Sequence, residues 1–339
     1  MFHLGPMAQA QDPALTRLLK EDSRSFYLTL RILPGAVRHQ IGLAYLLART
    51  SDTIADTELV PAADRLKALE QFRQALNQPG PSTVDFGELV RKQGNDAERT
   101  LLNQCSRSVA LFHALAAADR SLVQTVLNTI IGGQELDLRR FQGASAERMV
   151  ALRTDAELDD YTYRVAGCVG EFWTRICLAH LFFNQMREAA ELINDGIRFG
   201  KGLQLVNILR DIPADLRQGR CYLPEEKLAG AGLAPHDLVD TGTEARLRPL
   251  YNAYLDSAEA HLRAGWSYTI RFPRGYARLQ LACAWPILIG LETIDRLRVG
   301  HVLDGSHRIK VPRARIRRII VRSVLLYPWR NAWEKMAAV

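Results

Sequence analysis

The chain has 339 residues, of which 47% are hydrophobic, 24% charged and 8% aromatic, and this composition excludes a disordered or fibrous protein. The net charge is +7, but residues 305–333 contain eight Lys and Arg residues and no acid. The other 36 of the 44 Lys and Arg residues balance 37 Asp and Glu, which argues against a uniformly basic nucleic-acid-binding surface.

Apolar residues recur at three- and four-residue spacing through most of the chain, and this period predicts helices. Alternating strand patterns are missing, and residues 79–96 are predicted to form a surface loop. We therefore predict an all-α fold, with a flexible N-terminus over residues 1–14 and one domain over 15–339. The expected helices, in chain order, are 36–56, a short helix between Pro61 and Pro79, 97–117, 120–141, 156–183, 186–217, 243–270, 275–299 and 312–326.

Cysteine usage and the absence of apolar runs bear on the compartment. The five cysteines are scattered with no CxxC pair, which favours reduced thiols over disulfides or a zinc site. No signal peptide is evident, and no apolar stretch reaches the roughly 18 residues that a transmembrane helix needs. We therefore expect a cytoplasmic protein.

Two acidic motifs carry the main chemical signal. Asp52 and Asp56 lie in SDTIAD, and Asp211 and Asp215 lie in RDIPAD. Each pair has i, i+4 spacing, which places both carboxylates on one helix face and destabilises that helix by a few tenths of a kcal/mol, about 0.2–0.5. A cation would offset this repulsion, and carboxylate oxygens suit Mg²⁺ that also bridges to phosphates. On the pattern alone, a metal–diphosphate site and a solvated helix face stay open as alternatives.

The surroundings of the two motifs favour a site. Each acidic pair ends an apolar helix and follows an arginine, Arg49 in the first motif and Arg210 in the second. Gln204 and Asn207 continue the second acidic stripe toward the N-terminus of its helix. This stripe predicts a polar seam in a largely apolar cavity.

Four ordered motifs make the chain similar to a known family: SRSFYLTLRILP at 23–34, YLLARTSDTIAD at 45–56, YTYRVAGCVG at 161–170 and GLQLVNILRDIPADLRQGRCYLP at 202–224. With these motifs the chain resembles the squalene/phytoene synthase family, the head-to-head trans-isoprenyl diphosphate synthases, over roughly residues 15–320. The resemblance implies an isoprenoid synthase-type helical bundle around a central active-site cavity.

The resemblance also implies roles for individual residues. Tyr161 would act as an acid or base beside the departing diphosphate, together with the metal-binding acids in catalysis. The implied Mg²⁺ ligands are Asp52, Asp56, Asn207, Asp211 and Asp215. The implied diphosphate-binding residues are Ser23, Arg24, Ser25, Arg49, Gln204, Arg210 and Arg220.

The prenyl chain needs a pocket that keeps a carbocation away from water. Phe26 and Tyr45 are aromatic candidates, because aromatic faces stabilise cations, although core packing is the ordinary interpretation of each alone. The resemblance adds Val165, Ala166 and Gly167, the close-packed turn that shapes the prenyl tunnel.

Arg164 departs from the family pattern at its position. A contact with diphosphate, a contact with Asp137 or Glu171, and a surface salt bridge all stay open for Arg164.

Within the family, we expect a squalene synthase that joins two farnesyl diphosphates through presqualene diphosphate and reduces it with NADPH. Lys310 and Arg313 lie where squalene synthases contact the NADPH phosphate. The alternatives are phytoene, dehydrosqualene or hydroxysqualene formation without NADPH reduction, with geranylgeranyl diphosphate as the alternative substrate. A non-catalytic prenyl-lipid-binding protein is a remote alternative, and nucleic acid is not expected as a partner.

The basic C-terminal segment has helical periodicity. Ile316, Ile319, Ile320, Val324 and Tyr327 form one predicted stripe, and Arg315, Arg318 and Arg322 form another. We expect peripheral contact with the inner face of the cell membrane through this helix. The alternative is a docked C-terminal helix with solvated arginines.

Overall fold

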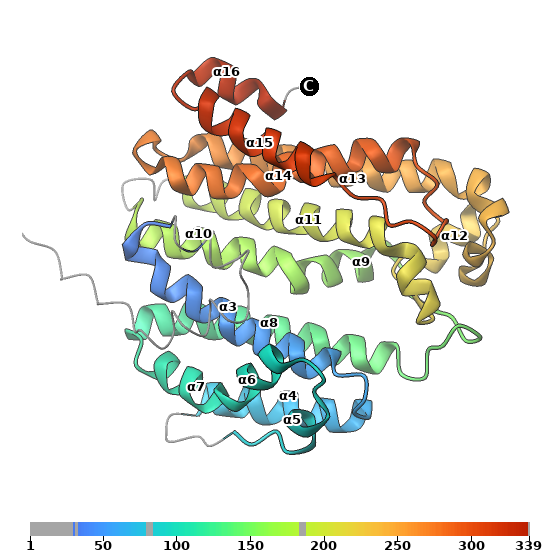
Figure 1. Ribbon diagram of the computed structural model, residues 1–339, viewed down its shortest axis with the longest axis horizontal. Helices are drawn as coiled ribbons and strands as arrows, with labels where there is room; N and C mark the ends of the chain where they lie inside the picture. Colours follow the sequence, from blue (N-terminus) through green and yellow to red (C-terminus); the bar gives the residue numbers. More distant parts are fainter. Residues whose placement is uncertain (1–29, 31–32, 79–83, 183–187, 338–339) are drawn as a thin grey trace, which may run out of the picture. The chain divides into compact units, whose positions relative to one another are not determined.

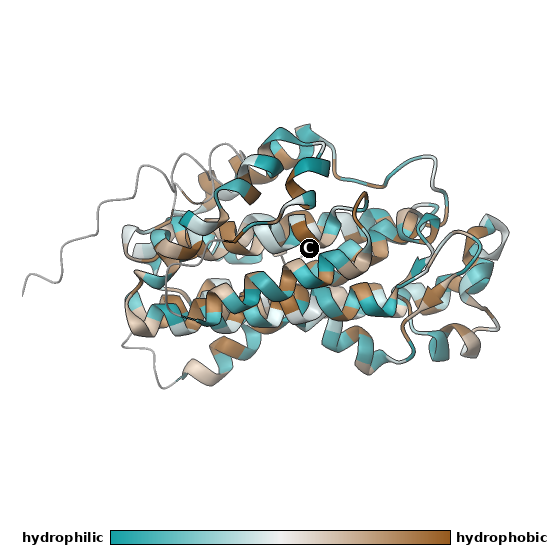
Figure 2. Ribbon diagram, turned by 90° about the horizontal axis from the view of Figure 1, so that it is seen from below, coloured by the Kyte–Doolittle hydropathy of each residue, from teal (hydrophilic) through white to brown (hydrophobic). Residues whose placement is uncertain are grey.

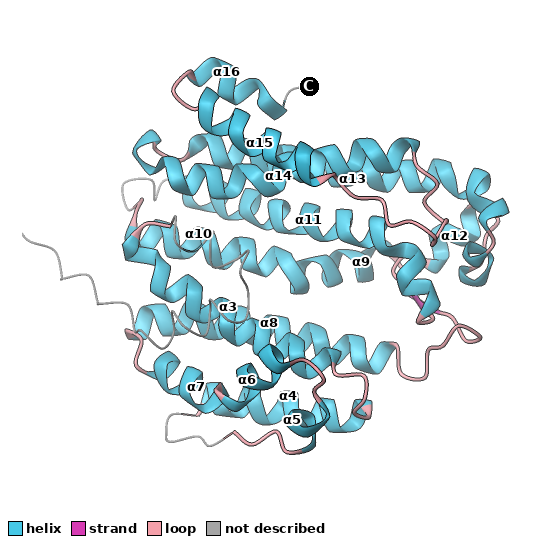
Figure 3. Cartoon of the chain, viewed as in Figure 1, coloured by secondary structure: helices cyan, strands magenta, loops and turns pink. Residues whose placement is uncertain are grey.

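The computed structural model describes residue 30 and residues 33–78, 84–182 and 188–337, and these are helical apart from short connections and one small strand pair (Figures 1 and 3). The predicted all-α class is confirmed. Internal contacts divide the chain into two compact units. Unit 1 comprises residues 1–139 and 175–187, and unit 2 comprises residues 140–174 and 188–339. The predicted flexible segment, residues 1–14, lies outside the described residues.

Unit 1 is built on α3, which packs against α4, α6 and α7. Apolar residues of α3 recur at helical spacing and are buried, among them Val37, Ile41 and Leu47. The predicted helix 97–117 is interrupted at Gln104, whose N–H bonds to two successive carbonyls, those of Thr100 and Leu101. The helices of unit 1 are α3 (Gly35–Asp56), α4 (Ala62–Asn77), α5 (Glu88–Lys92), α6 (Asp96–Asn103), α7 (Cys105–His113) and most of α8 (Ala117–Arg140).

Unit 2 has α11 at its centre, packed against α13 and against the π-helical turn η1, while α13 packs on α14 and α14 on α15 (Figure 1). Hydrophobic and hydrophilic residues share the same helices in Figure 2, as expected when each helix buries one face. The elements of unit 2 are α9 (Asp155–Thr162), η1 (Tyr163–Gly167), most of α10 (Cys168–His180), α11 (Ala189–Arg217), α12 (Glu225–Gly230), η3 (Pro235–Val239), η4 (Thr241–Thr243), α13 (Glu244–Arg271), η5 (Arg274–Tyr276), α14 (Ala277–Val299), α15 (Arg313–Leu326), α16 (Arg330–Glu334) and η6 (Lys335–Ala337).

Backbone-to-backbone contact fixes α11 against η1 and α10. A Cβ on Gly170 would lie 1.9 Å from the carbonyl oxygen of Gly196, and a Cβ on Gly200 would lie 2.1 Å from that of Ala166. Only glycine permits approach this close. Within the predicted helix 156–183 the structure has a π-helical turn, η1. This turn packs directly on α11.

One parallel strand pair, not predicted from the sequence, joins β1 (Val150–Ala151) to β2 (Arg220–Cys221). Strand β2 follows directly after α11, and Gly219 between the two has a left-handed φ of 74°. A Cβ on Gly219 would lie 2.2 Å from the carbonyl oxygen of Ser145, so glycine is required here on two grounds. Two-residue strands leave no alternating pattern, which is why the sequence did not reveal them.

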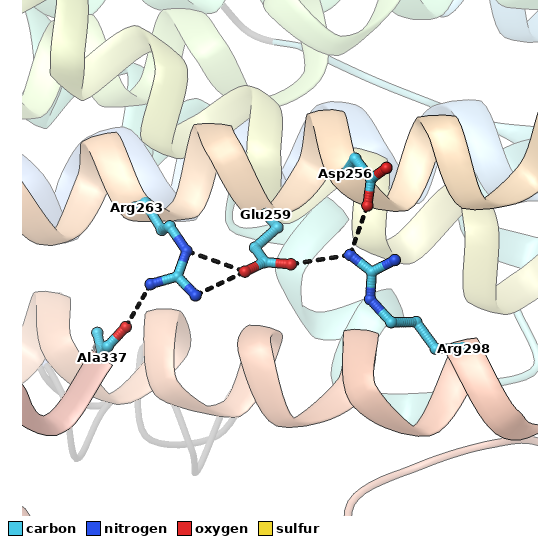
Figure 4. Close-up of polar contacts among 5 residues, drawn as sticks. All are labelled: Asp256, Glu259, Arg263, Arg298 and Ala337. Carbon is cyan, nitrogen blue, oxygen red and sulfur yellow. Dashed lines mark hydrogen bonds and ion pairs between the residues drawn. The ribbon is translucent and has the colours of Figure 1, made fainter. Parts of the chain in front are cut away.

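A polar network ties the C-terminal end of the chain to α13 and α14 (Figure 4). Arg263 donates through Nε and Nη2 to Glu259 and through Nη1 to the carbonyl oxygen of Ala337, at 2.6–2.9 Å. Arg298 on α14 donates to Asp256 and Glu259 at 2.7 and 2.8 Å. Glu259 therefore links α14 and the final turn of the chain to α13.

None of the helices in the described part of the chain is long and apolar enough to cross a membrane. All five cysteines are buried, and none forms a disulfide.

Candidate active site

The first acidic pair lies in the last two turns of α3, in unit 1. Asp52 is half-buried and accepts a hydrogen bond of 2.6 Å from Nε2 of Gln134 on α8, while Asp56 is exposed. The last turn of α3 contains no basic residue. A carboxylate at a helix C-terminus faces the negative end of the helix dipole, at a cost of about 0.3–1 kcal/mol. A bound cation would relieve that cost. Sequence reasoning missed Gln134.

Arg49 and Tyr45 precede this pair on α3. Nη2 of Arg49 pairs with Oε1 of Glu98 on α6 at 2.5 Å, so the arginine predicted to bind diphosphate is held by a carboxylate of unit 1. Tyr45 is half-buried. Four predicted site residues lie outside the described part of the chain: Ser23, Arg24, Ser25 and Phe26.

The second acidic pair lies near the C-terminus of α11, in unit 2, where two arginines bind Asp211. Arg210 donates to the two carboxylate oxygens at 3.0 and 2.7 Å, and Arg308, from the loop after α14, donates to the same two at 2.8 and 2.6 Å. Burial alone would raise the pKa of Asp211, but the two guanidinium groups outweigh it and hold this pKa below its ordinary value. Asp211 is therefore ionised, and both of its carboxylate oxygens accept hydrogen bonds from cationic side chains.

A small hollow of about 70 Å³ opens beside Asp211. Arg210, Arg217 and Arg308 line it, together with Pro213 and the 301–309 loop. The residues lining this hollow in the described chain do not include Lys310 or Arg313, which are both exposed. The sequence pointed to Lys310 and Arg313 in this basic segment. In the structure it is Arg308 of the same segment that bonds to Asp211 of the acidic motif.

The other carboxylate of the motif, Asp215, lies one turn further along α11 and lines a smaller hollow with Arg220 and Tyr222. Tyr161 stacks on Tyr222 at 4.6 Å between ring centroids, and Tyr222 meets Phe141 edge to face at 5.2 Å. The Arg220 guanidinium lies 6.0 Å from the centre of the Phe141 ring. Three predicted residues, Tyr161, Asp215 and Arg220, therefore share one aromatic cluster, to which the structure adds Phe141 and Tyr222.

The β1–β2 pair positions Arg220 in this cluster. The N–H of Val150 bonds to the carbonyl oxygen of Gly219 at 2.8 Å, and that of Leu152 bonds to the carbonyl oxygen of Cys221 at 3.0 Å. Arg220 thus lies on hydrogen-bonded backbone instead of on a free loop.

The predicted polar seam of α11 is present as a face of the helix. Gln204 and Asn207 are half-buried, as are both acids of the motif, whereas Leu205, Val206 and Leu209 between them are buried in unit 2. The side chains that could bind a ligand therefore share one face, and the apolar side chains hold the helix in place.

The predicted prenyl-pocket turn, Val165, Ala166 and Gly167, is the π-helical turn η1. Gly200 of α11 closely approaches Ala166 of this turn, as described above. Its role in a prenyl tunnel stays a prediction. Nε of Arg164 in the same turn bonds to Asp160 at 2.7 Å, so the carboxylate that this arginine faces is neither Asp137 nor Glu171.

Pro213 lies inside α11 between the two acids. Proline has no N–H, so it cannot bond to the carbonyl of Leu209 four residues earlier. The buried hydroxyl of Tyr251 on α13 donates to that carbonyl oxygen at 3.1 Å. Burial raises the pKa of Tyr251, which keeps the hydroxyl protonated as a donor. Tyr251 thus stabilises the helical turn that carries Asp211 and Asp215.

The donor chemistry of both motifs fits Mg²⁺. Nowhere in the described chain do three or more His, Cys, Asp and Glu side chains form a group that could hold a metal alone. Mg²⁺ is commonly held by one or two carboxylates, with phosphate oxygens and water completing its shell. Each motif supplies two carboxylates, and Asn207 adds an amide oxygen to the second.

The described helices form a helical protein of the isoprenoid synthase type, a fold that solved squalene synthases share. The chain belongs to the squalene/phytoene synthase family, a family of prenyl transferases, because the family model "Squalene/phytoene synthase" matches residues 19–315.

Individual relatives agree on the family and differ in their names. A presqualene diphosphate synthase of Zymomonas mobilis is 30% identical over 269 residues, covering 79% of each chain. A bifunctional lycopene cyclase/phytoene synthase of Pyrenophora tritici-repentis is 28% identical over 324 residues, and the match covers 91% of this chain but only 50% of that protein. The chain thus spans about half the length of that relative.

Solved structures share the fold. A dehydrosqualene synthase matches with a TM-score of 0.63 and 22% identity, covering 92% of this chain and 95% of that one. A squalene synthase from Alicyclobacillus acidocaldarius matches with a TM-score of 0.58 and 20% identity, covering 84% and 92%.

Proposed function

We propose that this protein is a squalene synthase, which joins two farnesyl diphosphates head to head into presqualene diphosphate and reduces that intermediate to squalene with NADPH. The observation that carries the proposal is the arrangement on α11. Two arginines hold Asp211 ionised, and Asp215 shares an aromatic cluster with Arg220 and Tyr161. Family membership supports a prenyl transferase acting on prenyl diphosphates.

The first half-reaction releases one diphosphate and one proton. Asp52 and Asp56 in unit 1, and Asn207, Asp211 and Asp215 in unit 2, are proposed to hold Mg²⁺, which would neutralise the charge of a departing diphosphate. Arg210 and Arg220 would bind its oxygens, because a guanidinium group offers two parallel donors to a phosphate. Arg49 and Gln204 are also proposed to bind diphosphate.

Tyr161 is proposed to receive the proton. Its ring is fixed by stacking on Tyr222, which restricts where its hydroxyl group can move. The aromatic neighbours of Tyr161 and the η1 turn, all in unit 2, would keep water from the carbocation, and Tyr45 in unit 1 is proposed to line the prenyl pocket.

NADPH would supply the hydride for the second half-reaction, in which the second diphosphate leaves. Lys310 and Arg313 are proposed to bind the phosphate of this cofactor. Both are exposed cations on the C-terminal side of Arg308, where an anionic cofactor could reach them.

A second candidate function is release of presqualene diphosphate as the final product. The relative from Zymomonas mobilis carries that name and matches the chain over 79% of both lengths. This candidate needs no NADPH, and so it differs from the first in one measurable requirement.

The experiment incubates purified protein with farnesyl diphosphate and Mg²⁺, with and without NADPH, and identifies the products by mass spectrometry. Squalene formed only with NADPH supports the proposal, and presqualene diphosphate under both conditions supports the second candidate. A parallel incubation supplies geranylgeranyl diphosphate, and a C40 product there with no C30 product from farnesyl diphosphate would overturn both. Asp52→Ala and Asp211→Ala should each abolish turnover, while Asp96→Ala, which removes an exposed acid of α6, should leave it unchanged.

A further inference from the structure

The C-terminal helix α15 is docked to the rest of unit 2 through one face. Nε1 of Trp285 on α14 donates to Oγ of Ser323 at 2.9 Å, and Arg315 pairs with Glu292 at 2.9 Å. The following segment is fixed more firmly still, because Trp333 is fully buried and stacks on Trp266 at 4.9 Å. The orientation of α15 is therefore set by a packed interface.

The predicted apolar stripe of this helix forms most of the docked face. Ile316, Ile319, Ile320 and Tyr327 are half-buried toward α14, but Val324 is not part of that face. The helix instead has a second apolar row that points outward. Its exposed fractions are 56% for Val321, 47% for Val324, 63% for Leu325 and 65% for Trp329, just beyond the helix.

Arginines continue this outward row along the same helix. At 100° per residue, Arg317 and Arg318 lie on the side of Val321 and opposite the buried Ser323, and Arg322 flanks them. All three arginines are exposed, and none has an ion-pair partner within the described part of the chain. We call these side chains the outer face of α15: Arg317, Arg318, Val321, Arg322, Val324, Leu325 and Trp329.

We propose that the outer face of α15 is a docking surface for an anionic lipid bilayer. Exposed valine, leucine and tryptophan side chains suit the boundary between headgroups and acyl chains, and tryptophan is enriched at that depth. Neighbouring arginines attract anionic headgroups. The helix lies along the membrane surface, in keeping with the absence of a spanning helix among the described elements.

The charge of the outer face selects a bilayer over a second copy of the chain. In a two-fold dimer the same patch meets itself, which would bring three arginines of each copy together. No acid lies between residues 305 and 333 to offset them. An anionic surface neutralises the arginines while it buries the apolar row.

Vesicle flotation with the full-length protein tests the proposal. Vesicles of phosphatidylcholine are compared with vesicles that also contain phosphatidylglycerol, at low and high salt. The protein should float with the anionic vesicles and lose binding at high salt, because the arginine attraction is screened. The variant Arg317→Gln/Arg318→Gln/Arg322→Gln should lose roughly 100-fold in affinity for anionic vesicles, given about 1 kcal/mol for each arginine.

The variant Val321→Ser/Leu325→Ser/Trp329→Ser should bind at least about tenfold more weakly to anionic vesicles, because buried apolar area contributes to interfacial binding. A matched control, Val239→Ser/Val299→Ser, removes two exposed valines elsewhere in unit 2 and should bind normally. A truncation at residue 312 is unsuitable because it removes the buried Trp333.

Unchanged flotation of the apolar variant would overturn the proposal. So would light scattering that shows a dimer dissociating in this variant while vesicle binding persists, since the outer face would then contact a second copy. Turnover of farnesyl diphosphate in detergent should be equal in all variants. Loss of vesicle binding can therefore be distinguished from loss of the proposed activity.

Discussion

Asp211 shows how a single side chain acquires its properties from residues far apart in the sequence. Arg210 is its neighbour in the chain, whereas Arg308 reaches it from a loop 97 positions away. The doubled arginine contact keeps Asp211 ionised despite partial burial. Arg308, which was not predicted as a site residue, therefore lies where a diphosphate beside Asp211 would meet it.

Replacing Arg308 is expected to affect the first half-reaction. Loss of a charge-assisted contact costs about 1.5–3 kcal/mol, so Arg308→Gln should lower kcat/KM for presqualene diphosphate formation by roughly 10- to 150-fold. Lys310→Gln, a matched change in the same loop, should stay within about threefold of the wild type when measured without NADPH. Equal effects of the two variants would mean that only the net charge of the loop matters.

At the scale of an element, α11 is continuous through Pro213 because α13 supplies the missing donor. Tyr251 bonds to the Leu209 carbonyl at 3.1 Å and is fully buried. The helix thereby keeps its direction where both carboxylates of the motif project from it.

A double-mutant cycle tests whether the Tyr251 hydroxyl replaces the N–H that Pro213 lacks. Tyr251→Phe leaves a buried carbonyl without its donor and should lower the free energy of unfolding by about 1–3 kcal/mol. In the Pro213→Ala background the backbone N–H can bond to Leu209, so the same change should cost about 1 kcal/mol less. Urea unfolding measures all four proteins, and strictly additive effects would contradict the role assigned to Tyr251.

Arg263 holds the C-terminal turn through the Ala337 carbonyl, and Glu259 positions Arg263, so the protonation state of Glu259 affects this contact. The hydrogen bond from Arg263, opposed by desolvation and assisted by Arg298, holds the pKa of Glu259 below its ordinary value of 4.5. A carboxyl with a lowered pKa in the folded state stabilises the protein above its unfolded pKa, and this contribution is lost as the pH falls through the lowered value.

Glu259→Gln should therefore reduce stability at pH 7 and unfold less steeply than the wild type as the pH falls below 4.5. Thermal unfolding of both proteins from neutral pH to pH 3 measures the difference. If the difference in unfolding temperature between the wild type and the variant is the same at every pH, the stabilising role assigned to ionised Glu259 is wrong.

At the scale of the whole molecule, the five cysteines have burial in common. All are buried and none forms a disulfide, and desolvation raises the pKa of Cys105, Cys168, Cys221 and Cys283 to about 12. A thiolate is the reactive form, so these thiols are chemically quiet in the folded protein.

A thiol-labelling experiment checks this expectation. The folded protein should react with a disulfide reagent only at the rate of its unfolding, and denaturant should expose all five thiols at once. Rapid labelling of the native protein by one equivalent or more would contradict the burial of that thiol.

Much of the fold followed from periodicity, because helices bury one face with residues close together in sequence. The predicted helices 36–56, 186–217 and 275–299 match α3, α11 and α14 closely. The strand pair at Arg220 and the π-helical turn at Tyr163 left no local pattern and were not predicted. Both depend on contacts between segments distant in the chain.

The sequence by itself determined the helical class, the family and the two acidic pairs, because i, i+4 spacing and ordered motifs are local properties of the chain. Only the tertiary structure decided which cations reach Asp211, which donor replaces the N–H missing at Pro213, and which face of α15 is free. These depend on packing between elements, and packing brings together residues such as Leu209 and Tyr251 that no local pattern connects.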